Sequence, residues 1–209
     1  MKRLLFSMFC ASVVLLLSPG VAFAKPARAK AAPSVAAAKD ATEKLTPKQG
    51  QDDAMVDALA RSEIVAAKKL HKKGVSYDAL ASSDEMTGLM RLADEGDDSG
   101  VASVLALGAN INAKNLNNET ALWFAVYSGH EKLALNLLKK GANAEGQRPD
   151  SKECLMHMAA QSGLSTLALR LKKLTPKCLT QKDIDGRTPA EAAKSLGYMK
   201  LAKSLTPKK

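Results

Sequence analysis

The 209-residue sequence contains few of the side chains that carry chemistry: three histidines, three cysteines and only 4% aromatic residues. It has no glycine-rich phosphate-binding loop and no Ser/His/Asp signature, which argues against nucleotide-dependent and triad-based catalysis. His71 and His130 are isolated in the sequence. We therefore expect no catalytic residue, no metal site and no cofactor.

Two short motifs could be mistaken for reactive sites. Cys154 and His157 are one helical turn apart and could ligate a metal or form a nucleophile pair, but no third or fourth ligand is nearby in the sequence. The run Asp183-Ile-Asp185-Gly186 is similar to the start of a calcium loop, yet the remaining ligands and the terminal Glu are absent. We interpret both motifs as structural.

The charge of the chain is +10, but it is unevenly distributed. Residues 51–129 hold seven basic and twelve acidic side chains, net −5, whereas residues 130–209 hold sixteen basic and seven acidic ones, net +9. Such a gradient can orient a charged partner, although a solvated lysine surface is the ordinary alternative. The few aromatic residues are not interleaved with the basic ones, so we expect no nucleic-acid partner.

The first 24 residues have the pattern of a secretion signal. A basic start, Met1-Lys2-Arg3, precedes the apolar run 4–21, and Ala22-Phe23-Ala24 offers a cleavage site before Lys25. An uncleaved membrane anchor is the alternative, but Pro19-Gly20 interrupts the apolar run and the run is short for a spanning helix. We therefore predict a periplasmic protein with no transmembrane anchor after cleavage.

Residues 25–51 are expected to form a flexible basic leader. They consist largely of Ala, Lys, Pro and Thr and offer almost no apolar surface to bury. Six basic and two acidic side chains give the leader a net charge of +4. It is interpreted as a solvated spacer, with weak attraction to anionic envelope polymers as the alternative.

One stretch of the remaining chain forms a complete repeat unit. Thr120-Ala-Leu-Trp-Phe-Ala-Val126 is followed by Gly129, a leucine-rich segment and Gly141-Ala-Asn-Ala144, and Gly108 precedes Gly141 by 33 residues. These residues resemble the ankyrin-repeat family, in which Thr-Pro-Leu-His-x-Ala-Ala opens the first of two helices and Gly-Ala-Asp leads into a finger loop. The resemblance implies an all-α solenoid of about four to five helix-turn-helix repeats.

Neighbouring copies follow in the same register. Thr87–Ala93 with Gly96, Cys154–Ala160 with Gly163, and Thr188–Ala193 with Gly197 repeat the opening of the unit. The predicted ankyrin-repeat domain covers 52–207, with a degenerate cap at 52–86, repeats at 87–115, 116–149 and 150–182, and a C-terminal cap at 183–207.

Local chemistry supports this register. Thr120 and Thr188 suit helix N-caps, and Pro189 suits a first helical position. Gly129, Gly163 and Gly197 suit left-handed residues at the ends of first helices. The apolar residues must be buried between neighbouring repeats, because one helix pair cannot bury its own face; examples are Leu122, Leu133, Leu137 and Leu138.

Cys154 and Cys178 remain after signal cleavage and fall in the same repeat. Cys154 occupies the usual Thr cap position, and Leu174-Thr-Pro-Lys177 replaces the usual Gly-Ala-Asx turn. In an oxidising compartment the two cysteines could form a disulfide; two buried free thiols are the alternative.

The resemblance also implies where a partner binds. In such stacks the positions one, four and five residues after the structural His line the concave face, with finger loops beside them. The corresponding groove residues are Arg91, Asp94, Glu95, Phe124, Tyr127, Ser128, Met158, Gln161, Ser162, Ala192 and Ser195. The candidate finger residues are Asn115, Asn117, Asn118, Gln147, Arg148, Asp150 and Lys182.

Phe124, Tyr127 and Met158 are predicted to form an exposed apolar patch at the centre of the groove, of the kind that dominates binding energy. In the alternative, Phe124 turns inward between helices. Trp123, at the structural His position, is expected to be partly buried packing.

The expected function is therefore non-catalytic protein binding by a protein that is monomeric when alone. The chain resembles small exported bacterial ankyrin-repeat proteins, some of which chaperone or restrain a secreted enzyme. That resemblance implies a periplasmic enzyme as partner, with inhibition of a peptidoglycan hydrolase, in a self-protection role, as the leading hypothesis. The alternatives are a protective partner of a redox enzyme such as catalase, and a basic cell-wall tether.

Overall fold

The computed structural model describes residues 47–145 and 152–207, which form five helix pairs and contain no β-strand. None of the helices in this part of the chain is long and apolar enough to cross a bilayer. The first helices of the pairs are α1 (Pro47–Ala60), α3 (Gly88–Glu95), α5 (Ala121–Tyr127), α7 (Leu155–Gln161) and α9 (Pro189–Ser195). The second helices are α2 (Ile64–Lys72), α4 (Asp98–Ala106), α6 (Glu131–Lys139), α8 (Ser165–Leu174) and α10 (Met199–Leu205), and a 3-10 helix, η1 (Pro176–Leu179), follows α8.

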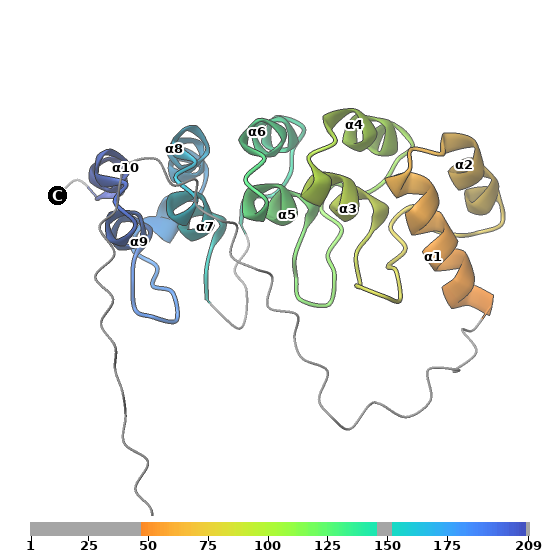
Figure 1. The fold of residues 1–209 in the computed structure, drawn as a ribbon, viewed down its shortest axis with the longest axis horizontal. Coiled ribbons are helices and arrows are strands. Elements are labelled where there is room, and N and C mark those ends of the chain that lie inside the picture. The colour runs from red at the N-terminus through yellow and green to blue at the C-terminus, as the bar shows by residue number, and fades with distance from the viewer. Residues whose placement is uncertain (1–46, 146–151, 208–209) are drawn as a thin grey trace, which may run out of the picture. The chain divides into compact units, whose positions relative to one another are not determined.

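The helices are arranged in two layers (Figure 1). The first helices pack side by side in the order α1, α3, α5, α7 and α9 and form what we call the inner layer. The second helices form the outer layer, in which α6, α8 and α10 are in contact. The loops that connect one pair to the next extend away from the outer layer, beside the inner helices, and we call them the fingers.

A continuous apolar core lies between the layers. It runs from Met55 in α1 to Leu205 in α10 and includes the predicted core residues of the central repeat. Leu122, Leu133, Leu137 and Leu138 are all buried, which confirms that assignment. Each pair therefore covers the apolar faces of its neighbours, as expected for a solenoid.

The predicted helix boundaries follow from local chemistry. The hydroxyls of Thr120 and Thr188 accept hydrogen bonds from the backbone N–H groups of Trp123 and Glu191, at 3.3 and 3.4 Å. These bonds confirm both N-caps. Gly129, Gly163 and Gly197 have φ values of 80°, 68° and 84°, which confirms their left-handed conformation.

The first helix begins earlier than predicted. Because α1 starts at Pro47, residues 47–51 are helical and do not belong to a flexible leader. This polar segment buries little, but it continues a helix that is anchored by the buried Met55, Val56 and Leu59. Proline is also favoured at a first helical position, where the missing N–H has no intrahelical acceptor. Residues 1–46, with the predicted signal peptide, lie outside the described part of the chain.

Two glycines in the same conformation provide a matched test of packing between repeats. Gly96 and Gly129 both have φ of 80°, but a Cβ atom on Gly96 would lie 2.6 Å from atoms of the His130 ring, whereas one on Gly129 would meet nothing within 4 Å. The His130 ring also bonds the backbone carbonyl of Asp94 through Nε2, at 2.9 Å.

We expect Gly129→Ala to lower the free energy of unfolding by about 1 kcal/mol through backbone strain alone. Gly96→Ala should lower it by about 2–3 kcal/mol, because it also displaces His130 from its bond. Urea unfolding of the two variants measures the difference. Equal losses would show that the contact of His130 with Gly96 contributes nothing.

Candidate protein-binding face

The central feature of the inner layer is a pair of stacked rings on α5. Trp123 and Tyr127 are four residues apart and therefore lie on the same side of the helix. Their ring centroids are 5.0 Å apart and the ring planes differ by 13°. Both side chains pack against the core and are partly exposed, so the stack contributes aromatic surface to the inner layer.

The prediction of an exposed apolar patch is wrong for two of its three residues. Phe124 and Met158 are only 4% and 5% exposed, and both belong to the core. Because α5 and α7 pack side by side in the inner layer, these long side chains fill the space between helices instead of facing solvent. Phe124 lies edge-on to Trp123, with ring centroids 5.2 Å apart, and thus packs against the stack. Of the three residues, only Tyr127 remains a candidate contact.

The groove residues of α3 are charged, and two of them are bonded to neighbouring elements. Arg91 forms ion pairs with Asp57 of α1 at 2.9 Å and with Asp84 of the preceding finger at 3.2 Å. Partial burial opposes the charge of Arg91, but its bonds to Asp84 and Asp57 outweigh that effect and raise its pKa. Asp94 accepts a hydrogen bond from the Ser128 hydroxyl, which links α3 to α5.

Together these side chains form an acidic strip beside the aromatic stack. We define the strip as Asp57, Asp84, Asp94 and Glu95, of which Asp57 and Glu95 are exposed. Arg91 is bonded to two of them, so the five side chains carry a net charge of −3. A surface of this charge favours a partner with a basic surface.

On the other side of the stack the predicted groove residues are uncharged. Gln161 of α7 donates a hydrogen bond to Glu153 at 2.9 Å, and Ser162 is exposed. In the last pair Ala192 is buried, and the Ser195 hydroxyl donates to the Ala192 carbonyl at 2.8 Å. Ala192 is therefore not available as a contact, because it faces the core.

The finger between α4 and α5 is held by one of the residues predicted to touch a partner. Asn115 is buried, and its Oδ1 accepts bonds from the backbone N–H groups of Asn117 and Glu119, at 3.0 and 2.8 Å. Its amide donates to the Glu119 carboxylate at 2.8 Å. Asn115 is thus a turn-forming residue, and its prediction as a contact is wrong because its polar atoms bond within the finger. Asn117 and Asn118 are exposed at the tip.

The finger between α8 and α9 has the same construction. Burial would raise the pKa of Asp183, but hydrogen bonds and ion pairing with Arg187 lower it. Lys182 is exposed, as predicted for a contact residue. Gln147, Arg148 and Asp150, in the finger between α6 and α7, lie outside the described residues.

Both of these fingers also carry an exposed apolar residue. Leu116 and Ile184 occupy the same position, directly after the Asx residue that holds each turn, and both are largely exposed. Both residues lie within the finger tips predicted from the sequence, 115–118 and 182–184, but only the polar residues around them were named as contacts. The signal that could have identified them is the parallel between Asn115-Leu-Asn117 and Asp183-Ile-Asp185.

The Cys154 and His157 pair is built into the core. His157 is fully buried, and its Nδ1 accepts a bond from the Cys154 backbone N–H at 3.3 Å. Its Nε2 faces the Arg187 carbonyl at 3.1 Å, which can only accept, so Nε2 carries the proton. His157 thereby joins the start of α7 to the next finger. No group of three or more potential metal-ligating residues occurs in the described ranges.

The two cysteines are buried free thiols that interact with each other. The contact with Cys178, together with burial, raises the pKa of the Cys154 thiol. A thiol in this state stays protonated and is a poor nucleophile. The predicted disulfide between Cys154 and Cys178 stays a prediction.

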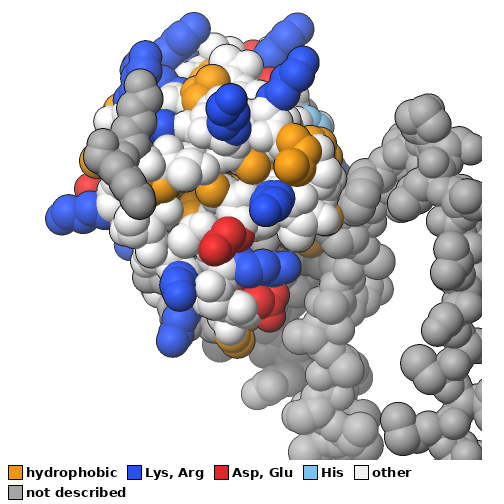
Figure 2. All heavy atoms as spheres, turned by 90° about the vertical axis from the view of Figure 1, so that its left-hand side faces the viewer, with side chains coloured by type: hydrophobic (Ala, Val, Ile, Leu, Met, Phe, Trp, Pro, Cys, Tyr) orange, Lys and Arg blue, Asp and Glu red, His pale blue; other side chains and the backbone are white. Residues whose placement is uncertain are grey.

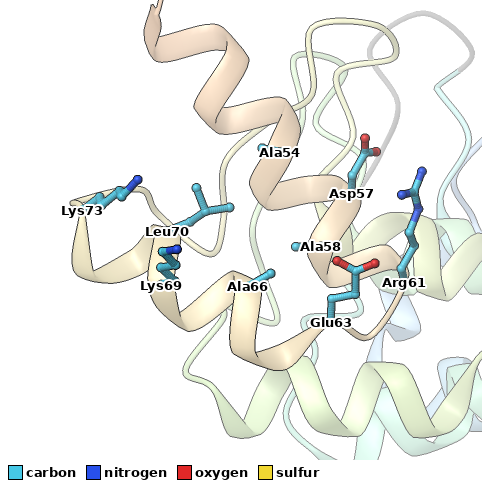
Figure 3. Close-up of a pocket in the computed structure, with 9 residues that line it drawn as sticks. All are labelled: Ala54, Asp57, Ala58, Arg61, Glu63, Ala66, Lys69, Leu70 and Lys73. Atoms are coloured by element: carbon cyan, nitrogen blue, oxygen red, sulfur yellow. The ribbon is translucent and has the colours of Figure 1, made fainter.

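A hollow of about 460 Å³ lies between α1 and α2 (Figure 3). Alanines 54, 58 and 66 are among its lining residues, and so are side chains of both charges: Asp57, Arg61, Glu63, Lys69 and Lys73. All of its lining residues belong to the first helix pair and the turns beside it. Its mixed charge does not select a ligand class.

Comparison with known families agrees with this architecture. A family model described as ankyrin repeats, three copies, matches residues 89–174. The matched segment runs from α3 to the end of α8 and includes the aromatic stack and part of the acidic strip. Repeats of this kind are protein-binding modules. Residues 89–174 therefore match ankyrin repeats, and the described part of the chain is an all-α solenoid of five helix pairs that includes them.

Proposed function

We propose that this protein binds an enzyme of the bacterial cell envelope through its inner face and inhibits or sequesters it. A peptidoglycan hydrolase is the leading candidate, and the binding would protect the producing cell. The predicted signal peptide at residues 1–24 supports a periplasmic location. The small number of side chains suited to catalysis supports a binding role.

The observation that carries the proposal is the stack of Trp123 on Tyr127. Tyrosine and tryptophan dominate binding energies when they are central and surrounded by polar residues. Here the stack is central in the inner layer, with the acidic strip on one side and Gln161 and Ser162 on the other. The rings hold each other in place, so little conformational entropy is lost when a partner covers them.

The acidic strip adds a preference for the partner's charge. Asp94 and Glu95 lie on the helix next to the stack, and Asp57 and Asp84 continue the strip toward α1. Complementary charge speeds association and suppresses wrong partners more than it adds affinity. We therefore expect the partner to present a basic surface with an apolar centre, and we expect its association rate to fall as salt is added.

Replacing Tyr127 by aspartate tests this site. The variant should raise the Kd for the partner about thirtyfold, which corresponds to the loss of one strong aromatic contact of about 2 kcal/mol. Val65→Asp is the matched control, because Val65 is 84% exposed on α2 in the outer layer. Enzymes retained by the tagged protein from a periplasmic extract are identified, and each is then titrated with the three proteins.

If Tyr127→Asp binds as tightly as the control, the inner face is not the binding site. An activity assay on the retained enzyme then separates the roles. Inhibition of a peptidoglycan-cutting activity supports the leading hypothesis. Longer survival of an uninhibited redox enzyme such as catalase supports the protective alternative.

A further inference from the structure

In the helices of the C-terminal half, the basic residues lie mostly in the outer layer. The outer helices α6, α8 and α10 carry seven basic side chains and a single acidic one, Glu131. The inner helices of the same three pairs, α5, α7 and α9, carry one basic and one acidic side chain. The positive charge of this half is therefore concentrated on the surface that faces away from the inner face and the fingers.

This charge is largely uncompensated. None of the seven basic side chains on α6, α8 and α10 forms an ion pair with another described residue, and six of them are exposed. The one acidic residue, Glu131, accepts a hydrogen bond from the Leu167 backbone N–H at 3.0 Å, which links α6 to α8. Figure 2, which views the described unit from the α10 end, shows many more Lys and Arg than Asp and Glu side chains.

Exposed apolar side chains are interleaved with these cations. Leu169 and Leu174 of α8 are 42% and 43% exposed, and Met199 of α10 is 59% exposed. In the sequence Leu169 precedes Arg170, Leu174 follows Lys173, and Met199 precedes Lys200. Figure 2 also shows hydrophobic side chains among the Lys and Arg side chains at the α10 end of the unit. We call this surface of α6, α8 and α10 the basic outer face.

We propose that the basic outer face binds the surface of an anionic lipid bilayer. Lysine and arginine are attracted to acidic headgroups, and their long stems let the charge stay at the headgroup while neighbouring apolar side chains enter the interface. A purely ionic polymer would satisfy the cations but offers no apolar environment for Leu169, Leu174 and Met199. The combination therefore favours a bilayer over other polyanions.

This binding goes beyond the proposed function and does not depend on it. The basic outer face and the inner face lie on opposite layers of the described unit, so a protein held at a membrane would keep its aromatic stack accessible (Figure 1). The inference concerns only where the binding module works.

The test uses the full chain as purified and co-sedimentation with vesicles of phosphatidylcholine, with or without an equal share of phosphatidylglycerol. We expect binding only to the anionic vesicles. Lys173→Glu/Lys200→Glu/Lys203→Glu should weaken that binding at least about tenfold, since each reversal replaces attraction by repulsion at the membrane surface. The control, Lys68→Glu/Lys69→Glu/Lys72→Glu on α2, has the same change in net charge and should weaken it less than about threefold.

A second variant separates the bilayer from other polyanions. Leu169→Ser/Met199→Ser leaves every charge in place and should weaken vesicle binding about threefold or more, without changing retention on heparin or on purified peptidoglycan. Equal losses for the two lysine variants would overturn the proposal, because net charge alone would then explain binding. Unchanged vesicle binding of the serine variant would overturn it in favour of a general polyanion surface. Thermal unfolding of each variant confirms that the solenoid is intact.

Discussion

Replacement of His157 by alanine is expected to lower the free energy of unfolding by about 3 kcal/mol, the largest effect of any single substitution considered for this protein. The ring is fully buried and bridges the Cys154 backbone N–H to the Arg187 carbonyl. Its removal leaves both groups without that partner inside the core and creates a cavity. Urea unfolding followed by circular dichroism measures the loss.

His130→Ala is the matched control. His130 also bonds a backbone carbonyl, that of Asp94, but through one nitrogen only and from a partly exposed position. We expect a loss of about 1 kcal/mol for this variant, since water can replace the bond. A loss for His157→Ala no greater than that for His130→Ala would contradict the bridging role of His157.

Oxidation of Cys154 and Cys178 is expected to raise the free energy of unfolding by about 3 kcal/mol, because the bridge would restrict the unfolded chain between α7 and η1. Cys154 at the start of α7 and Cys178 in η1 are both buried, and their thiols interact electrostatically in the reduced fold. Glutathione disulfide supplies the oxidant, accepting two electrons as the thiols lose two protons. The measurements are non-reducing mass spectrometry and unfolding with and without dithiothreitol.

Cys154→Thr serves as the control for this prediction. Threonine occupies the equivalent N-cap at positions 87, 120 and 188, so the variant keeps the helix start but cannot form the bridge. Its unfolding should not respond to dithiothreitol. If the wild-type protein, exposed to the oxidant, still alkylates at both cysteines after denaturation, the predicted disulfide does not form.

The repeat architecture could be predicted because its determinants are local. Thr120 and Thr188 cap helices through their own hydroxyls, and Gly129 adopts a conformation that other residues avoid. These signals lie within a few residues of the boundary that they set. They fix where each helix begins and ends without reference to the rest of the chain.

The features that could not be predicted depend on neighbouring repeats. Phe124 is at a position that often faces a partner, but the spacing of α5 and α7 decides whether a side chain of its size turns into the core. Asn115 was predicted as a contact, although its side chain forms the finger turn together with Glu119. Both errors arise because a residue type does not reveal which neighbour its side chain meets.

The distribution of charge over the folded surface could likewise not be predicted from the sequence alone. The sequence contains a gradient from an acidic first half to a basic second half. Once the helices are paired, seven of the sixteen basic residues of 130–209 lie on α6, α8 and α10 with a single acidic residue, while the acidic strip of the first half lies beside the aromatic stack. The charge gradient along the sequence thus corresponds to two surfaces of the folded chain: the acidic strip beside the aromatic stack and the basic outer face.

The central claim is that the partner protein is bound at the aromatic stack of the inner face. Site-specific photo-crosslinking in living cells tests it most directly, with a benzophenone amino acid at Tyr127 and, as the control, at Val65 on the outer layer. The account predicts that irradiation of the Tyr127 protein joins it to one envelope enzyme and that the Val65 protein forms no such adduct. An adduct with that enzyme from Val65 alone, or from neither position in cells where the enzyme co-purifies with the protein, would contradict it.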